Sequence, residues 1–259
     1  MNLRLIRGIF AIFSLLTTAY VYAADIYVVS SGGFAGAYKK LAPVFEAQTG
    51  NQLISAWGLS NGTSKNAIPM RLERGEEIDV VIMTGGSLDE LMAQGKLLPG
   101  SKVLLANSLI ACAIKQGEPK PDISTAAKLK EALLSAKTMA YSNGASGEYI
   151  KNTLMNSLGI KAQMASKLKQ TLAIPVGEAI ASGEAEIGCQ QLSELKEVEG
   201  IEIIGLLPQE VQLITPLFGA VVARSKVPMQ ARGLLMYLSS PANAHILVAN
   251  GLKPVTPNN

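Results

Sequence analysis

The feature that most constrains the fold is a regular alternation of short apolar runs with amphipathic segments. DIYVVS at 25–30 is rich in β-branched residues, and apolar residues recur at helical spacing over 34–48. IDVVIM at 78–83 is continuously apolar, which is typical of a strand covered on both faces. Alternating strands and helices predict a doubly wound α/β fold whose sheets are mostly parallel.

The same patterns predict where the elements lie. In the first half we expect strands at 25–30, 52–57 and 78–83 and helices at 34–48, 67–74 and 88–94. The second series has expected strands at 103–106, 109–114, 138–141, 186–189 and 201–206, and expected helices at 125–135, 147–158 and 178–182. The apolar run over 211–225 then leads to two final helices.

Six segments rich in glycine and small polar residues follow the predicted strands. They cover 30–34, 58–66, 83–87, 141–149, 174–178 and 189–194. Sheets of this kind bind ligands at the carboxyl ends of their strands, where loops enter helices. Backbone N–H groups and hydroxyls would converge there with the positive ends of helix dipoles, so we predict an anion site.

Lys65 is the most informative charge in these loops. It lies in the donor-rich stretch GLSNGTSKNAI, directly before a predicted helix. A cation is unfavourable at a helix start unless an anion binds beside it. Lys65 is therefore either an anion ligand or a solvated surface lysine. Tyr149, after the donor loop of Ser146 and Gly147, either reaches the site with its hydroxyl or packs.

The first 23 residues have the features of a cleaved signal peptide. Arg4 and Arg7 precede a short apolar run, and Val21 and Ala23 are small residues at the −3 and −1 positions of a cleavage site. No cysteine follows for a lipid anchor, and the apolar run is short for a bilayer span. We expect an exported periplasmic protein that starts near Ala24 and has no membrane anchor.

The composition argues against a nucleic-acid partner. Removing the signal leaves 21 basic against 20 acidic residues, which is too balanced for non-specific binding to DNA. Cys112 and Cys189 lie in apolar runs, so two buried thiols and a disulfide are both consistent with the sequence. The cysteine and histidine spacing indicates no metal site, and no cofactor motif is found. We expect Asp79 to cap or pair rather than catalyse.

The chain resembles the type II periplasmic solute-binding proteins, in the branch of the molybdate-binding proteins. The similarity is carried by SGGFAGAYKKLAPVFEAQTG at 31–50, IPMRLERGEEIDVVIMTGGSLDELMAQGKL at 68–97 and GEAEIGCQQLSEL at 183–195. It implies two α/β lobes, each a mostly parallel sheet flanked by helices, joined by two crossover strands around an interlobe ligand cleft. It implies that residues 24–104 and 216–259 form lobe 1, and that residues 105–215 form lobe 2.

The family's pocket holds its oxyanion with serine hydroxyls, backbone amides and a tyrosine. In this sequence Gly33 stands at the first serine position, Lys65 or Asn66 near the second, and Gln190 or Gln191 at the tyrosine. A cation and amides suit an anion that carries carboxylates better than molybdate. The predicted ligand-binding residues are Ser30, Ser31, Gly32, Gly33, Thr63, Ser64, Lys65, Asn66, Ser146, Gly147, Tyr149, Gln190 and Gln191.

The segment over 123–160 is similar to a sub-branch of periplasmic aconitate isomerases. This resemblance implies interconversion of cis- and trans-aconitate by allylic proton transfer, without a cofactor. Lys65, Glu148 and Tyr149 are then the candidate proton-transfer groups, and position does not rank them. The alternative is a non-enzymatic binding protein that delivers an oxyanion or polycarboxylate to an ABC permease.

Overall fold

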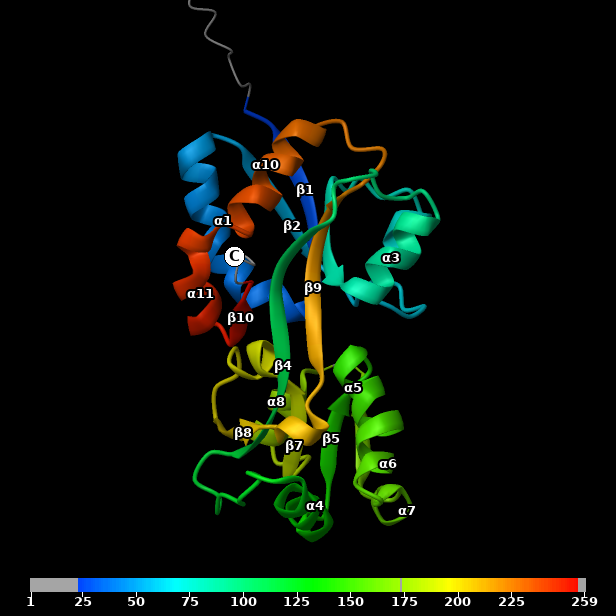
Figure 1. Ribbon diagram of the computed structural model, residues 1–259, viewed down its shortest axis with the longest axis vertical. Coiled ribbons are helices and arrows are strands. Elements are labelled where there is room, and N and C mark those ends of the chain that lie inside the picture. Colours follow the sequence, from blue (N-terminus) through cyan, green and yellow to red (C-terminus); the bar gives the residue numbers. More distant parts are fainter. Residues whose placement is uncertain (1–22, 173, 256–259) are drawn as a thin grey trace, which may run out of the picture.

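The computed structural model describes residues 23–172 and 174–255. Two lobes are stacked along the long axis of the molecule, and two long strands run between them (Figure 1). These strands are β4 (Val103–Lys115) and β9 (Ile214–Val221), which pair antiparallel with each other. The predicted two-lobed α/β architecture is confirmed.

The sheet of the first lobe is built around three parallel strands. β1 (Asp25–Ser30) pairs with β2 (Gln52–Trp57) on one side and with β3 (Val80–Thr84) on the other. β9 continues the sheet antiparallel to β3, and β10 (Leu252–Pro254) pairs antiparallel with β4. The carboxyl ends of β1, β2 and β3 therefore share one edge of the sheet.

The second lobe repeats this arrangement. β5 (Met139–Ser142) pairs in parallel with β6 (Leu168–Thr171) and with β7 (Ile187–Gln191). β4 pairs antiparallel with β7 and with β8 (Ile201–Leu206). The crossover strands thus make each lobe a mixed sheet rather than a purely parallel one.

Helices flank both sheets (Figure 1). Those of the first lobe are α1 (Gly32–Thr49), α2 (Ile68–Glu73), α3 (Gly85–Ala93), α10 (Pro228–Leu238) and α11 (Ala244–Ala249). Those of the second are α4 (Ala126–Ser135), α5 (Ala145–Tyr149), α6 (Met155–Ser157), α7 (Lys161–Met164), α8 (Val176–Ala181) and α9 (Leu192–Leu195).

Each lobe has its own apolar core on both faces of its sheet. In the first lobe one cluster joins α1, α10 and the β sheet around Phe34 and Leu235, and another lies around Leu88. In the second lobe the clusters lie around Leu154 and Ile180. Hinge closure of the lobes about the crossover strands stays a prediction, with which the separate cores are compatible.

Most predicted elements are present, with instructive differences. The two strands expected at 103–106 and 109–114 are one continuous strand, β4, because Asn107 and Ser108 pair with β9 and β10 instead of turning. The helix expected at 147–158 is interrupted by a π-helical turn over Ile150–Leu154. Four short elements, β6, β10, α7 and α9, were not predicted, since three or four residues carry little periodicity.

Cys112 and Cys189 form a disulfide. They face each other across the antiparallel pair of β4 and β7, with Cα atoms 4.0 Å apart, and both are fully buried. Of the two alternatives left open by the sequence, the bridged one holds. The bond ties a crossover strand to the strand that ends at Gln190 and Gln191.

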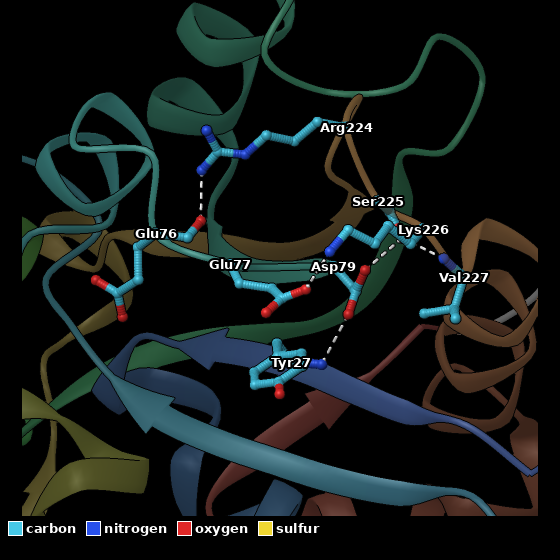
Figure 2. Close-up of polar contacts among 8 residues, drawn as sticks. All are labelled: Tyr27, Glu76, Glu77, Asp79, Arg224, Ser225, Lys226 and Val227. Carbon is cyan, nitrogen blue, oxygen red and sulfur yellow. Dashed lines mark hydrogen bonds and ion pairs between the residues drawn. The ribbon is translucent and has the colours of Figure 1, made fainter.

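A polar network closes the end of the first sheet that lies opposite the carboxyl edge (Figure 2). The buried carboxylate of Asp79 accepts hydrogen bonds from the Tyr27 backbone N–H, at 2.9 Å, and from the Ser225 hydroxyl, at 2.6 Å. Lys226 pairs with Glu77 beside it. Asp79 is therefore engaged in hydrogen bonds that join β1 to the chain that follows β9.

Candidate functional site

A cavity of about 500 Å³ lies between the lobes. All six of the glycine- and hydroxyl-rich loops singled out in the sequence contribute to its wall. Its lining includes Ser31, Gly32, Gly33, Lys39, Gly58, Leu59, Ser60 and Thr84 from the first lobe, and Ser142, Gly144, Ser146, Thr171, Pro175, Glu178, Gln190, Gln191 and Glu194 from the second.

The start of α1 forms the first-lobe wall. Ser31 has extended backbone and precedes this 18-residue helix, but its side chain makes no capping hydrogen bond. Its hydroxyl oxygen is buried and has no hydrogen-bond partner among the described residues, although the residue lines the cavity. The first N–H groups of a helix have no intrahelical acceptor, so this wall offers donors and a positive dipole end to an anion.

Ser60 and Thr84 lie beside it. The Ser60 hydroxyl accepts the backbone N–H of Thr84 at 3.1 Å, which joins the loop after β2 to the start of the nine-residue helix α3. The Thr84 hydroxyl donates to Ser87 at 3.3 Å. This pairing adds two hydroxyl groups and a second helix start to the same wall.

In the second lobe the turn after β5 is unusually tight. Ser142 and Ser146 line the cavity with their hydroxyl oxygens 3.3 Å apart. A Cβ placed on Gly147 would lie 1.6 Å from the Ser142 carbonyl oxygen, so only glycine fits there. Gly147 thus brings both serines into the wall without lining the cavity itself.

The two glutamines at the end of β7 have different roles. Gln191 accepts a hydrogen bond from Ser108 of β4, at 2.7 Å, and donates to Thr215 of β9, at 3.1 Å, so its amide fastens both crossover strands. Gln190 accepts the N–H of Val176 at the start of α8 and donates to the carboxylate of Glu194. Both side chains are buried and already engaged.

Glu194 is the acid of the cavity that reaches from the second lobe to the first. It lies in the first turn of α9, and a Cβ placed on Gly32 would approach its Oε1 to 2.6 Å, so the carboxylate rests against the start of α1. Burial raises the pKa of Glu194 to about 7, against the opposing effect of the Gln190 hydrogen bond. A carboxyl group from one lobe therefore meets the helix start of the other.

Two further contacts bridge the lobes at this point. The Ser193 hydroxyl donates to the Gly33 carbonyl at 2.8 Å and is buried. Lys39 of α1 pairs with Glu197 at 2.9 Å on the cavity rim. Together they hold α9 against α1.

The structure brings six of the thirteen predicted ligand-binding residues to the cavity wall: Ser31, Gly32, Gly33, Ser146, Gln190 and Gln191. Ser30 is fully buried behind it, with its hydroxyl donating to the Ser31 carbonyl at 3.0 Å. Gly147 lies behind Ser142, as described above.

The two parts of the loop that contains Lys65 lie in different surroundings. Gly58, Leu59 and Ser60 line the cavity, whereas Thr63, Ser64, Lys65 and Asn66 are exposed and lie outside its lining. The Ser64 carbonyl accepts the Ala67 N–H, so this part of the loop turns into α2. A ligand role for these four residues stays a prediction, without support from the cavity geometry.

The other candidate proton-transfer groups also lie outside the lining. The Tyr149 hydroxyl donates to the Val211 carbonyl at 2.8 Å, which is the packing alternative. The exposed carboxylate of Glu148 accepts from Asn152 at 2.8 Å. Neither side chain points a free group into the cavity wall in this arrangement.

The predicted site residues did not include Glu194, Lys39, Ser60 or Thr84, although all of these except Lys39 lie in loops singled out in the sequence. Glu194 lay inside a noted loop, but an acid in the first turn of a helix is an ordinary dipole-stabilising residue. Only the contact with Gly32 across the interlobe cavity distinguishes it, and that contact depends on how the lobes meet.

Two kinds of feature are absent from the described residues. None of their helices is long and apolar enough to cross a membrane. Within the same ranges, no group of three or more histidine, cysteine, aspartate or glutamate side chains is arranged to hold a metal ion.

Known proteins resemble this chain in sequence and in fold. The chain is 45% identical over 228 residues to an aconitate isomerase from a Pseudomonas species, covering 88% of this chain and 87% of that protein. Its fold matches the periplasmic molybdate-binding protein of Azotobacter vinelandii, with a TM-score of 0.71 and 20% identity over 90% of this chain and 100% of that one. A sulfate-binding protein from Mycobacterium tuberculosis matches with a TM-score of 0.67 and 15% identity, covering 90% and 88% of the two chains.

The two solved structures are too distant in sequence to say more than that the fold is shared. The family model described as bacterial extracellular solute-binding protein matches residues 26–253, nearly all of the described chain. This protein is a member of the bacterial extracellular solute-binding protein family.

Proposed function

We propose that this protein is an aconitate isomerase, which interconverts the cis and trans isomers by moving the double bond. The observation that carries the proposal is 45% identity to a protein of that name over most of both chains. The cavity supports it, because donor groups and one perturbed carboxyl group line the same space.

The isomerisation of aconitate requires few protein groups. A proton leaves the methylene carbon next to the double bond, the electron pair of that C–H bond becomes delocalised over three carbons, and a proton returns to the former vinyl carbon. Charge develops on a carboxylate conjugated with the carbanion. Donors aimed at that carboxylate in a cavity shielded from water would lower the barrier.

The cavity offers such donors. The start of α1, the unpartnered Ser31 hydroxyl and the serine pair of the second lobe would bind the substrate's carboxylates. Among the described residues, Lys39 is the basic side chain of the lining, and Glu197 already pairs with it. Recognition would therefore depend on hydrogen bonds and helix dipoles more than on cations.

The lobe boundaries belong to this proposal as well. We propose that residues 24–104 with 216–259 and residues 105–215 act as two bodies that close on the tricarboxylate. We also propose that the segment 1–23 directs export of the protein to the periplasm. Most of that segment lies outside the described residues.

Transport is the alternative, in which the protein would pass an anion to an ABC permease. Purified protein that starts at Ala24 should convert trans-aconitate to cis-aconitate at protein concentrations far below the substrate's. Chromatography measures the cis-aconitate that is formed. Thermal stabilisation across tricarboxylates, molybdate and sulfate gives the ligand class independently. Stabilisation by an anion without any conversion, even at equal protein and substrate concentrations, would favour transport.

A further inference from the structure

We propose that Glu194 is the catalytic residue that removes and returns the proton in this reaction. The assignment rests on the proposed function and deepens it. Its basis is the position of the carboxylate, which enters the cavity from the second lobe and reaches the helix start of the first.

The two carboxylate oxygens of Glu194 are in different situations. Oε2 accepts a hydrogen bond from Gln190, whose own amide oxygen is fixed by the Val176 N–H at 3.2 Å. Oε1 lies against Gly32, and no hydrogen bond to it is found among the described residues. Gln190 thus holds the side chain in place as a positioning residue and leaves Oε1 available to a substrate.

The protonation state suits the task. A proton-transfer group works best when its pKa is close to the operating pH, because both forms are then populated. Burial raises the pKa of Glu194 to about 7. The other charged groups around the cavity are Glu178, which is exposed, and the Lys39–Glu197 pair on the rim.

The step balances without any other reactant. Ionised Glu194 takes the methylene proton, the C–H bond breaks, and its electrons shift the double bond by one carbon. Protonated Glu194 then gives that proton to the former vinyl carbon and is ionised again. The donors at the start of α1 would hold the conjugated carboxylate while it carries the charge.

The contact with Gly32 links this residue to closure. Because Glu194 is on α9 and Gly32 is on α1, the carboxylate occupies its place only when the lobes are together. Ser193, the preceding residue, fixes the same contact through the Gly33 carbonyl. Proton transfer would thus be confined to the closed cavity.

The test compares Glu194→Gln with wild type, using trans-aconitate in both a rate and a binding measurement. The rate of cis-aconitate formation should fall at least about 100-fold, the usual contribution of a proton-transfer group. Thermal stabilisation by trans-aconitate should persist. Glu199→Gln is the matched control, since Glu199 is exposed, lies outside the lining and has no ion pair among the described residues.

If Glu194 had only a structural role, the pH dependence of kcat would not depend on this residue. Wild-type kcat should rise as pH increases through about 7, and Glu194→Asp should keep a pH-dependent but lower rate. If Glu194→Gln retains more than a tenth of the wild-type rate, or loses binding together with activity, the assignment is overturned while the isomerase function stands. If wild type itself converts no substrate, the proposed function fails first, and the assignment with it.

Discussion

Replacing Ser31 with alanine should make the ligand-free protein more stable and its ligand binding weaker. The hydroxyl oxygen of Ser31 is buried, with 6% of the residue exposed, and has no partner among the described residues. An unsatisfied buried polar group costs about 1–3 kcal/mol. Alanine would remove that cost, and no capping hydrogen bond would be lost, because Ser31 makes none.

The same hydroxyl should matter when an anion is bound. A hydrogen bond to a charged group contributes about 1.5–3 kcal/mol, so the Kd for trans-aconitate should rise roughly 10- to 100-fold. Relief of about 1 kcal/mol in the free protein should raise its Tm by about 2–4 °C. Thermal unfolding without ligand and isothermal titration with trans-aconitate measure the two effects.

Ser30→Ala is the matched control because it removes the hydroxyl of the adjacent residue. Ser30 is fully buried, but its hydroxyl donates to the Ser31 carbonyl at 3.0 Å. Its loss should destabilise the protein by about 0.5–1.5 kcal/mol and remove no group from the cavity wall. If Ser31→Ala also destabilises the free protein and leaves the Kd unchanged, the hydroxyl does not serve the cavity.

Three further predictions follow from single contacts. Gly147→Ala should destabilise the protein by about 1–3 kcal/mol or more, because its Cβ would meet the Ser142 carbonyl oxygen at 1.6 Å. Gly86→Ala, which has open space around its Cβ, should not destabilise it, and urea unfolding measures both variants. Reducing the Cys112–Cys189 disulfide, which closes a 77-residue separation, should cost up to about 4.5 kcal/mol, and a Cys112→Ala/Cys189→Ala variant should be insensitive to reductant. Because folding raises the pKa of Glu194 from 4.5 to about 7, the folded protein holds a proton that the unfolded chain releases, so stability should fall by up to about 3 kcal/mol as pH rises between these values. Glu194→Gln should lose this dependence, and an unchanged pH profile of unfolding would contradict the shift.

Local sequence patterns predicted the fold well because its signals are local. Continuous apolar runs identified β1 and β3, and glycine-ended periodic segments identified α1. The loops at the carboxyl ends of the strands were found for the same reason, and all six reach the cavity. The continuous β4 was missed, since its polar residues are satisfied by pairing with strands distant in sequence.

The site was harder to predict because its decisive contacts cross between the lobes. Lys65 looked significant from its neighbours in the sequence, but its part of the loop turns outward into α2. Glu194 looked ordinary in the sequence, and only its approach to Gly32 makes it distinctive. Whether a side chain points into an interlobe cavity depends on lobe orientation, which no local pattern encodes.

A crystal structure of the Glu194→Gln variant with trans-aconitate tests the central claim most directly. We expect substrate in the interlobe cavity, with one carboxylate at Ser31 and the start of α1. The side chain at position 194 should lie about 3–3.5 Å from the reacting carbons. Substrate bound at the exposed loop around Lys65, or a cavity that remains empty at saturating trans-aconitate, would contradict it.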